Sequence, residues 1–246
     1  MTIASLPMYD WPEMHAETDA EWAQIRAAMP ELDLPAALTR PDDRPGFLND
    51  HWRDPALVFS QCCWGPLNVG MIRHLLPLAQ PDYGPYLGGR GPFYRSAMVM
   101  RDTGETPPVM AVPATSGAAF PSQPLKGQRF AFNDTESKSG YRGLAVDLGG
   151  DPADFAAALV QSGSHRQSVR MIADGRADVA VIDCRSWALA QRFEPVAAAL
   201  RVVGWTSERM GIVYVTSRAT DPGTALRLQT MLLAQGCLPA PQGETV

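Results

Sequence analysis

The sequence has few cysteines and none of the common metal or nucleotide signatures. It contains four cysteines in 246 residues: Cys62 and Cys63 are adjacent, and Cys184 and Cys237 are isolated. This spacing does not indicate a disulfide framework. No HExxH or CxxC pattern accompanies the four histidines, and GxGxxG and P-loop signatures are missing. These absences argue against metal and nucleotide chemistry, so we predict no metal ion, no cofactor and no catalytic residue.

Long apolar runs and clusters of basic residues are also missing. No uninterrupted apolar segment reaches the roughly 20 residues of a membrane helix, so we expect no membrane span. The formal net charge is −5 without a basic run, which argues against a nucleic-acid partner. Residues 1–9 lack the basic and apolar regions of a signal peptide. We expect a cytoplasmic protein, or a periplasmic one if a signal peptide has been removed.

The sequence does contain an alternation of strand-like and helical segments. Buried strands are predicted at three short apolar runs, Ala56–Ser60, Ala177–Asp183 and Leu200–Trp205. Helices are predicted between the strands, including 69–76 and 151–160. This alternation predicts an α/β fold with mostly parallel sheets. No linker separates sequential domains, so two lobes with chain crossings near residues 94–98 and 205–211 fit the pattern better.

The segment Arg129–Tyr141 is the most informative part of the chain. An apolar run predicts a buried strand, a turn ends it, and a helix is predicted from Tyr141. A strand that leads through a small-residue loop to a helix N-terminus can bind an oxyanion, because backbone N–H groups, the helix dipole and two serine hydroxyls converge there. The candidate residues are Ser137, Lys138, Ser139, Gly140 and Tyr141. The alternative is that one serine only caps the helix.

Two further polar residues lie at element boundaries. His165 follows the helix-capping residue Ser164, so a second helix N-terminus would face the same anion. The alternative for His165 is a core or capping histidine. Asp183 ends a buried strand, at the sheet edge where open α/β sheets bind ligands, and its carboxylate would suit an amine on the ligand. The alternative for Asp183 is an N-cap for the helix from Arg185.

The same sheet-edge argument selects four residues nearer the N-terminus. Tyr9 and Asp10 follow the first predicted strand, and Gln61 and Cys62 follow Ala56–Ser60. The alternative for Tyr9 is that it only packs in the core. Cys62 could also act as a nucleophile beside His165, but no neighbouring cation is present to lower the pKa of its thiol.

The order and spacing of these motifs resemble one known family. Phe132–Tyr141, Gly163–Ser168 and Ala177–Asp183 follow one another as in the phosphate-, phosphite- and phosphonate-binding proteins of ABC importers. The likeness covers roughly residues 3–235 and includes the segments Gln61–Pro66, Tyr94–Ser96, Leu125–Gly127 and the strand that ends at Trp205.

The resemblance implies a two-lobed type II periplasmic-binding-protein fold, α/β with mixed, mostly parallel sheets joined by two hinge crossings. Lobe one would comprise residues 1–95 with 217–246, and lobe two residues 96–216. The resemblance also implies that the phosphonate oxygens are bound by Ser137, Lys138, Ser139 and His165. It further implies that Tyr94 is a tyrosine of the cleft.

The chain departs from the family pattern at two places. Lys138 stands where a small hydroxyl residue is common, and Thr206–Met210 replaces a segment that is often rich in proline. We therefore expect the anion pocket to be kept, and the part of the site that recognises the rest of the ligand to differ.

The leading hypothesis is a non-enzymatic solute-binding protein. It would capture a small oxyanion, a phosphonate or phosphate ester, in an interlobe cleft that closes at a hinge. Its partners would be the anionic ligand and an ABC transporter permease or a signalling protein. The alternatives are a cytoplasmic enzyme of cofactor biosynthesis on the same fold and a cytoplasmic ligand sensor.

Overall fold

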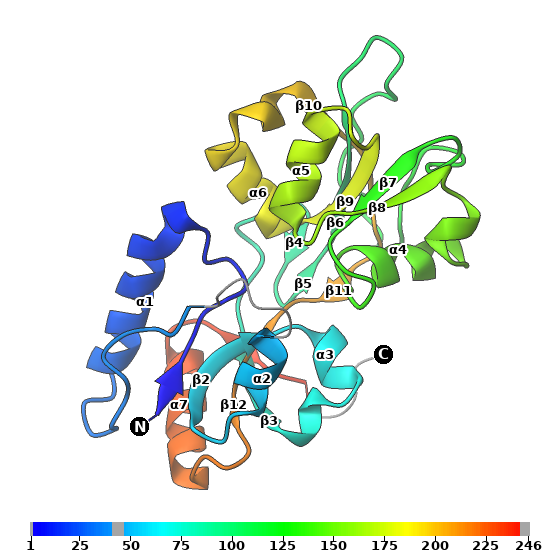
Figure 1. Cartoon of the computed structure of the whole chain (residues 1–246). Helices are drawn as coiled ribbons and strands as arrows, with labels where there is room; N and C mark the ends of the chain where they lie inside the picture. The colour runs from blue at the N-terminus through cyan, green and yellow to red at the C-terminus, as the bar shows by residue number, and fades with distance from the viewer. Residues whose placement is uncertain (1, 41–46, 242–246) are drawn as a thin grey trace. The chain divides into compact units, whose positions relative to one another are not determined.

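The computed structural model describes residues 2–40 and 47–241. The chain divides into two compact units, one of Met1–Asp82 with Gly211–Val246 and one of Tyr83–Met210 (Figure 1). The chain enters the second unit after Asp82 and leaves it after Met210. These bounds differ from the expected lobes, because residues 83–95 belong to the second unit and residues 211–216 to the first.

Within the described residues, the first unit contains a five-stranded sheet of order β1-β2-β12-β3-β13. Its strands are β1 (Ile3–Ala4), β2 (Leu57–Cys62), β3 (Leu75–Gln80), β12 (Val213–Ser217) and β13 (Leu238–Pro239). β1 is parallel to β2, whereas β12 lies between β2 and β3 and is antiparallel to both. The segment that returns from the second unit therefore occupies the centre of this sheet.

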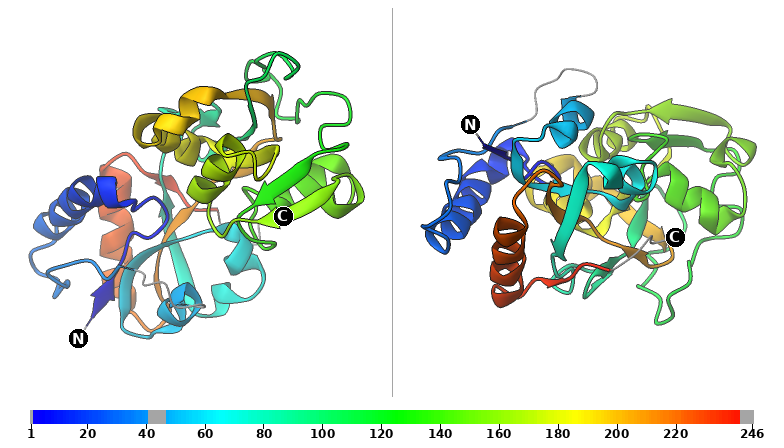
Figure 2. Two further views of the ribbon diagram at one scale, coloured as in Figure 1. Left: turned by 45° about the horizontal axis from the view of Figure 1, so that its top comes forward. Right: turned by 90° about the horizontal axis from the view of Figure 1, so that it is seen from below.

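The helices of the first unit are α1 (His15–Ala27), α2 (Phe47–Arg53), α3 (Trp64–Asn68) and α7 (Pro222–Ala234), with short 3-10 turns at Pro12–Met14 and Met71–Arg73. α1 and α7 lie beside each other against the sheet (Figure 2). Trp22 of α1 stacks on Phe59 of β2 at 5.7 Å between ring centroids, and Leu228 of α7 is fully buried in the same core. Full burial of each such side chain contributes about 1.5–3 kcal/mol.

The described part of the second unit has a five-stranded sheet of order β10-β6-β9-β7-β8. Its strands are β6 (Ser96–Arg101), β7 (Arg129–Phe132), β8 (Ala158–Gln161), β9 (Val179–Asp183) and β10 (Leu200–Trp205). β7 is parallel to β8 and β9, so the carboxyl ends of these strands share one edge. β6 is antiparallel to β9 and β10. A smaller sheet joins β4 (Gly89–Arg90), β5 (Phe93–Tyr94) and β11 (Arg209–Met210).

The helices of the second unit are α4 (Tyr141–Leu148), α5 (His165–Ala173) and α6 (Cys184–Phe193), with 3-10 turns at Pro152–Asp154 and Pro195–Ala199. α4 covers one face of the sheet, and α5 and α6 cover the other (Figure 1). Leu144 of α4 is fully buried against Phe130 and Val179, which point to the same face from β7 and β9. The start of α4 is therefore fixed just beyond the end of β7.

Two predicted helices are wrong. Residues 69–76 contain only a 3-10 turn, because Gly70 at φ +130° interrupts the chain and Leu75 begins β3, which pairs with β12. Residues 151–160 contain one capped 3-10 turn, after which Ala158 begins β8 and pairs with β7. In both segments, pairing with a distant strand overrides the local helical pattern.

The expectation of mostly parallel sheets is also wrong in its proportion. The sheets are mixed, but antiparallel pairs outnumber parallel pairs among the described strands. β6 and β12 account for much of this difference, since each follows a crossing between the units and lies antiparallel to its neighbours. In the described residues, none of the helices has the length and hydrophobicity to cross a bilayer.

Candidate anion-binding site

The segment between β7 and α4 forms a tight loop at the carboxyl edge of the second sheet. The Asp134 carboxylate accepts a hydrogen bond from the Glu136 N–H at 2.7 Å, and the Asp134 carbonyl accepts one from the Ser137 N–H at 3.2 Å. These bonds turn the chain toward the helix. We call the next four residues, Ser137–Gly140, the serine loop. α4 begins directly after it at Tyr141.

The two serines and the histidine predicted from the sequence come together in one hydrogen-bonded chain. Ser137 Oγ lies 3.1 Å from Ser139 Oγ, and Ser139 Oγ lies 2.6 Å from His165 Nε2. Simple capping does not describe the serines, because the N-cap of α4 is Gly140 and no side chain caps this helix. Three polar groups from two segments thus converge beside a helix N-terminus, where backbone N–H groups favour negative charge.

Gly140 is required by the shape of the serine loop. A Cβ atom on this residue would lie 2.4 Å from Asn133 Oδ1 and 3.3 Å from Ser137 Oγ, and the Gly140 N–H donates to Ser137 Oγ at 3.1 Å. The sequence predicts Asn133 only as part of the turn that ends the strand. Its position at the carboxyl end of β7, a parallel strand, is the signal that could have added it to the candidate set.

His165 lies at the first position of α5, as the sequence predicts. Ser164 is the N-cap of this helix, and its hydroxyl accepts from the Gln167 N–H at 3.1 Å. The His165 side chain is 11% exposed. Burial lowers the pKa of His165, and the nearby Asp183 carboxylate offsets part of this effect. The ring is therefore neutral at neutral pH, and its buried Nδ1 has no hydrogen-bond partner among the described residues.

Asp183 caps α6, which is the alternative that the sequence left open. Its Oδ1 accepts from the N–H groups of Arg185 at 3.1 Å and Ser186 at 2.9 Å. Its Oδ2 lies 3.5 Å from His165 Nε2. The carboxylate thus fixes a helix start and also faces the imidazole.

The Ser139, His165 and Asp183 side chains do not have the geometry of a hydrolase triad. In a triad the serine and the carboxylate contact opposite nitrogens of the imidazole, so that the ring can pass a proton between them. Here both contact Nε2 of His165. The cluster therefore lacks the geometry by which a triad activates its serine as a nucleophile.

Lys138 lies within the serine loop, and Tyr141 follows the loop as the first residue of α4. Burial lowers the pKa of Lys138, and the positive charges of Arg142 and Arg209 lower it further. The Tyr141 hydroxyl donates to the Asp151 carboxylate, and burial together with this bond raises the pKa of Tyr141 to about 12. The tyrosine is thus held by a carboxylate of its own unit, while the lysine adds positive charge near the loop.

Tyr94 belongs to the same unit as the serine loop but to the smaller sheet. It is buried in β5, and its ring packs against the Tyr83 ring at 5.6 Å between centroids. Its backbone lies opposite Arg209 of β11 and Gly89 of β4. The structure thus places Tyr94 beside the segment that leads out of the second unit.

The remaining predicted residues, Tyr9, Asp10, Gln61 and Cys62, belong to the first unit. Tyr9 is buried. Asp10 is ion-paired with Arg40, whose Nε lies 2.8 Å from Asp10 Oδ2. The expected strand end is wrong, because β2 continues through Gln61 and Cys62. The Gln61 amide oxygen accepts from the Met8 N–H at 3.3 Å.

Cys62 has no accessible side chain in this structure, since it is fully buried. Its thiol donates to the Cys63 carbonyl, and burial raises the pKa of Cys62 well above its ordinary value. A thiolate is therefore disfavoured at this position, which removes the chemical basis for a nucleophile.

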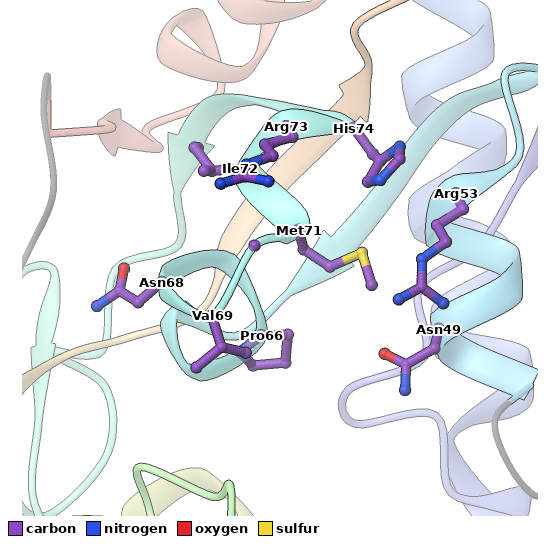
Figure 3. A pocket seen from close by; sticks show the side chains of 10 residues that line it. Asn49, Arg53, Pro66, Asn68, Val69, Met71, Ile72, Arg73 and His74 are labelled. Atoms are coloured by element: carbon purple, nitrogen blue, oxygen red, sulfur yellow. The ribbon is translucent and has the colours of Figure 1, made fainter.

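The first unit also has a surface cavity of about 520 Å³ that sequence reasoning did not find. It is lined by residues of α2, α3 and the turn that precedes β3, among them Arg53, Met71 and His74 (Figure 3). None of the residues predicted from the sequence lines it. Among the described residues there is also no cluster of three His, Cys, Asp or Glu side chains that could hold a metal ion.

Comparison with known proteins identifies the family. The model of the family described as ABC transporter, phosphonate, periplasmic substrate-binding protein matches residues 74–241. The chain belongs to this family. Members of the phosphonate-binding family are substrate-binding proteins rather than enzymes, so the non-enzymatic prediction is confirmed. Membership implies a small ligand and a transporter permease as partner, and the family description agrees with the periplasmic alternative.

Solved structures confirm the type II periplasmic-binding-protein fold. PhnD1 from Prochlorococcus marinus in complex with methylphosphonate is similar with 15% identity and a TM-score of 0.70, covering 95% of this chain and 83% of that chain. A binding protein component of an ABC phosphonate transporter from Pseudomonas aeruginosa shows 13% identity, a TM-score of 0.68 and coverages of 95% and 74%. XAC2383 from Xanthomonas citri bound to ATP shows 16% identity, a TM-score of 0.64 and coverages of 95% and 82%. No curated protein matches the sequence at a significant level.

Proposed function

We propose that this protein captures a phosphonate or phosphate ester and that the oxyanion is bound by Ser137, Ser139, His165 and the N-terminus of α4. One observation carries the proposal: the two serine hydroxyls and the imidazole form a continuous chain, with links of 3.1 and 2.6 Å, beside that helix N-terminus. Membership of the phosphonate-binding family and the fold shared with a methylphosphonate complex support the same ligand class.

The chemistry of the site suits a tetrahedral oxyanion. A serine hydroxyl can turn from its neighbour to a ligand oxygen, since its proton rotates freely about the C–O bond. Hydrogen bonds to a charged acceptor contribute about 1.5–3 kcal/mol each, so four or five of them support micromolar affinity after the costs of ordering. Lys138, which lies in the serine loop, adds positive charge that favours the more highly charged form of the ligand.

Recognition of the rest of the ligand is assigned to the first unit. In this proposal Tyr9, Asp10 and Gln61 complete the site when the two units close about the crossings of the chain, and Tyr94 lies near one of those crossings. The closed, liganded protein then delivers its ligand to the permease of an ABC transporter. This part of the proposal is supported by the family assignment.

Calorimetric titration tests the proposed ligand class. Ligand-free protein is titrated with methylphosphonate, 2-aminoethylphosphonate, phosphate and sulfate. We expect a phosphonate or phosphate to bind in the micromolar range, and Ser139→Ala to weaken this binding about ten- to hundred-fold through the loss of one charge-assisted hydrogen bond. Ser137→Ala should act in the same direction.

Ser122→Ala is the matched control, because Ser122 is an exposed serine of the same unit. Its affinity should equal that of the unaltered protein. The proposal is abandoned if folded, ligand-free protein gives no heat with any of the four anions. It is also abandoned if the loop variants bind as tightly as the control.

A further inference from the structure

The segment Thr206–Met210 is one of the two places where the sequence departs from the family pattern. It follows β10 and contains the last residues of the second unit before the chain returns to the first unit at Gly211. We call it the exit segment. Instead of prolines it carries Ser207, Glu208 and Arg209, and each of these side chains has a partner inside the second unit.

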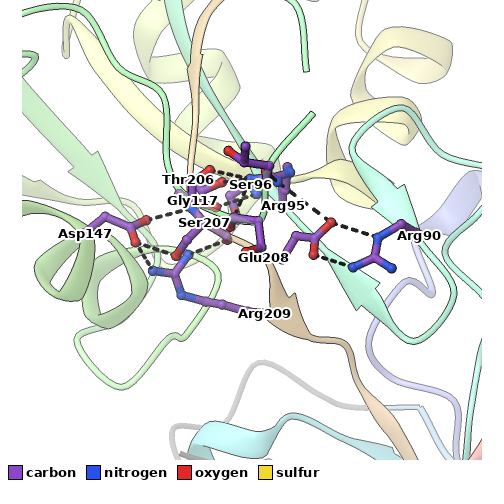
Figure 4. A network of polar contacts seen from close by, with 11 residues as sticks. Arg90, Arg95, Ser96, Gly117, Asp147, Thr206, Ser207, Glu208 and Arg209 are labelled. Atoms are coloured by element: carbon purple, nitrogen blue, oxygen red, sulfur yellow. Dashed lines mark hydrogen bonds and ion pairs between the residues drawn. The ribbon is translucent and has the colours of Figure 1, made fainter. Parts of the chain in front are cut away.

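Asp147 on α4 is the buried centre of the first group of contacts. Its side chain is only 4% exposed. Its Oδ2 accepts from the Ser207 N–H at 3.0 Å, and its Oδ1 accepts from Ser207 Oγ at 2.5 Å and pairs with Arg209 Nη2 at 2.8 Å. Both carboxylate oxygens are thus satisfied by the exit segment (Figure 4).

Arg209 reaches α4 at a second point, one turn nearer the serine loop. Its Nη2 donates to the Gly143 carbonyl, and its Nη1 donates to the Ser207 carbonyl at 2.9 Å. The absence of a side chain on Gly143 makes room for the guanidinium, since a Cβ there would lie 3.0 Å from Arg209 Nε. One arginine therefore holds both the first and the last turn of this eight-residue helix.

The exit segment is itself anchored to the body of the second unit. Glu208 accepts from Arg90 at 3.1 and 2.6 Å and lies 3.7 Å from the buried Arg95. Arg95 donates to the carbonyls of Gly117 and Thr206, both at 2.8 Å. These contacts appear as one continuous network in Figure 4. Arg209 thus extends from a fixed support rather than from a free loop.

We infer that Asp147, Ser207 and Arg209, here called the α4 clasp, position the serine loop for anion binding. An isolated helix of two turns is marginal in water, so the direction of α4 depends on its contacts. Oxyanion donors are effective only when they are held at the correct distance from the bound charge. The clasp supplies that constraint from the segment through which the chain leaves the unit. This inference rests on the proposed function, because it assigns a positioning role toward the same site.

The direction in which Asp147→Asn changes the affinity separates a positioning role from a direct effect of charge. Asp147→Asn removes a negative charge near the site, so a purely electrostatic role predicts tighter binding of an anion. A positioning role predicts weaker binding, because an amide cannot accept the same set of hydrogen bonds. We expect Asp147→Asn and Arg209→Gln each to weaken methylphosphonate binding at least tenfold. Arg209→Lys keeps the charge but replaces the planar guanidinium, whose two terminal nitrogens contact separate acceptors, by a single ammonium nitrogen, and should also bind more weakly than the unaltered protein.

The double variant and a second readout complete the test. Asp147→Asn with Arg209→Gln should lose no more affinity than the worse single variant, since the two residues act as one unit. In ligand-free protein, amide hydrogen exchange over residues 137–148 should be faster in these variants, with β6 and β9 unchanged. Arg176→Gln, which breaks an exposed ion pair with Asp174 outside this network, is the control and should keep its affinity within threefold.

The inference is overturned if Asp147→Asn binds methylphosphonate as tightly as the unaltered protein or more tightly. Unchanged exchange over residues 137–148 in the variants overturns it as well. Exchange is measured without ligand, so it tests the α4 clasp even if the unaltered protein binds no phosphonate. If the exchange changes as expected but the unaltered protein binds no phosphonate, only the proposed function fails.

Discussion

His165 combines burial with a hydrogen bond to a serine, and this combination sets its charge. Its ring lies beside Ser139 Oγ and the Asp183 carboxylate, yet burial is the larger effect, and it lowers the pKa of His165. A neutral ring can donate one N–H to a ligand oxygen without the cost of holding a buried positive charge in the unliganded protein. The residue is thus suited to binding an anion reversibly.

The lowered pKa of His165 predicts a pH dependence of stability. Between its native pKa and the unfolded value near 6.5, the unfolded state binds more protons, so stability falls as the pH falls through this range. His165→Asn removes this contribution. We expect the free energy of unfolding, from urea titrations at pH 7.5, 6.5 and 5.5, to fall more steeply for the unaltered protein than for the variant.

His51 provides an internal check on this experiment. Burial also lowers the pKa of His51, whose Nε2 lies 2.7 Å from Ser5 Oγ in the first unit. Because His51 is present in both proteins, its contribution cancels in the comparison. Equal slopes for the two proteins would contradict the assigned shift at His165.

At the scale of an element, α4 shows how a helix can require glycine within its own length. Gly143 lies in the middle of the helix, where alanine would normally be favoured by about 1 kcal/mol. A Cβ on Gly143 would lie 2.1 Å from the Lys138 carbonyl and 3.0 Å from Arg209 Nε. The neighbouring backbone belongs to the serine loop and cannot move without displacing it.

We therefore expect Gly143→Ala to reverse the usual sign. The substitution should destabilise the protein by about 1–3 kcal/mol, as overpacking does, and should weaken binding of the ligand. Urea titration and calorimetry measure the two effects. Gly104→Ala is the control, because no atom lies within 4 Å of a Cβ added there. A Gly143→Ala protein as stable as the control would show that the loop accommodates the methyl group.

The elements that sequence reasoning located best are those with a local start signal. α4 starts at Tyr141 as predicted, directly after the turn that ends β7. α5 starts after Ser164 as predicted, and the Ser164 hydroxyl caps it by accepting from the Gln167 N–H. Capping is a short-range interaction, so the residues that decide it are adjacent in the sequence. Asp151 caps its turn in the same way, but the conformation of Ala158–Gln161 beyond that turn is decided by pairing with β7.

At the scale of the whole molecule, the first unit is built from two segments that are distant in the sequence. Its sheet needs the C-terminal strands β12 and β13, and β12 lies between β2 and β3. A ligand that binds only the native protein therefore stabilises an arrangement that the chain reaches through many long-range contacts.

Ligand binding should accordingly raise the melting temperature. At a hundredfold excess over its dissociation constant, a ligand stabilises the native state by about 2.7 kcal/mol, which corresponds to a shift of about 5–10 °C for a chain of this size. Differential scanning fluorimetry with methylphosphonate measures this shift. Ser139→Ala should reduce this shift, because the stabilisation falls with the logarithm of the dissociation constant, whereas Ser122→Ala should retain it. No shift at millimolar methylphosphonate would argue against this ligand class.

The sequence by itself determined the features that depend on neighbouring residues. These are the strand, turn and helix start around Ser137–Gly140, the capped start of α5 at His165, and the motif order that identifies the family. The tertiary structure decided which side chains meet: that Ser139 contacts His165, that Cys62 is buried, and that Arg209 holds α4 through Asp147. Such contacts depend on how strands separated in the sequence pair and on which face each side chain then occupies, and no local pattern specifies either.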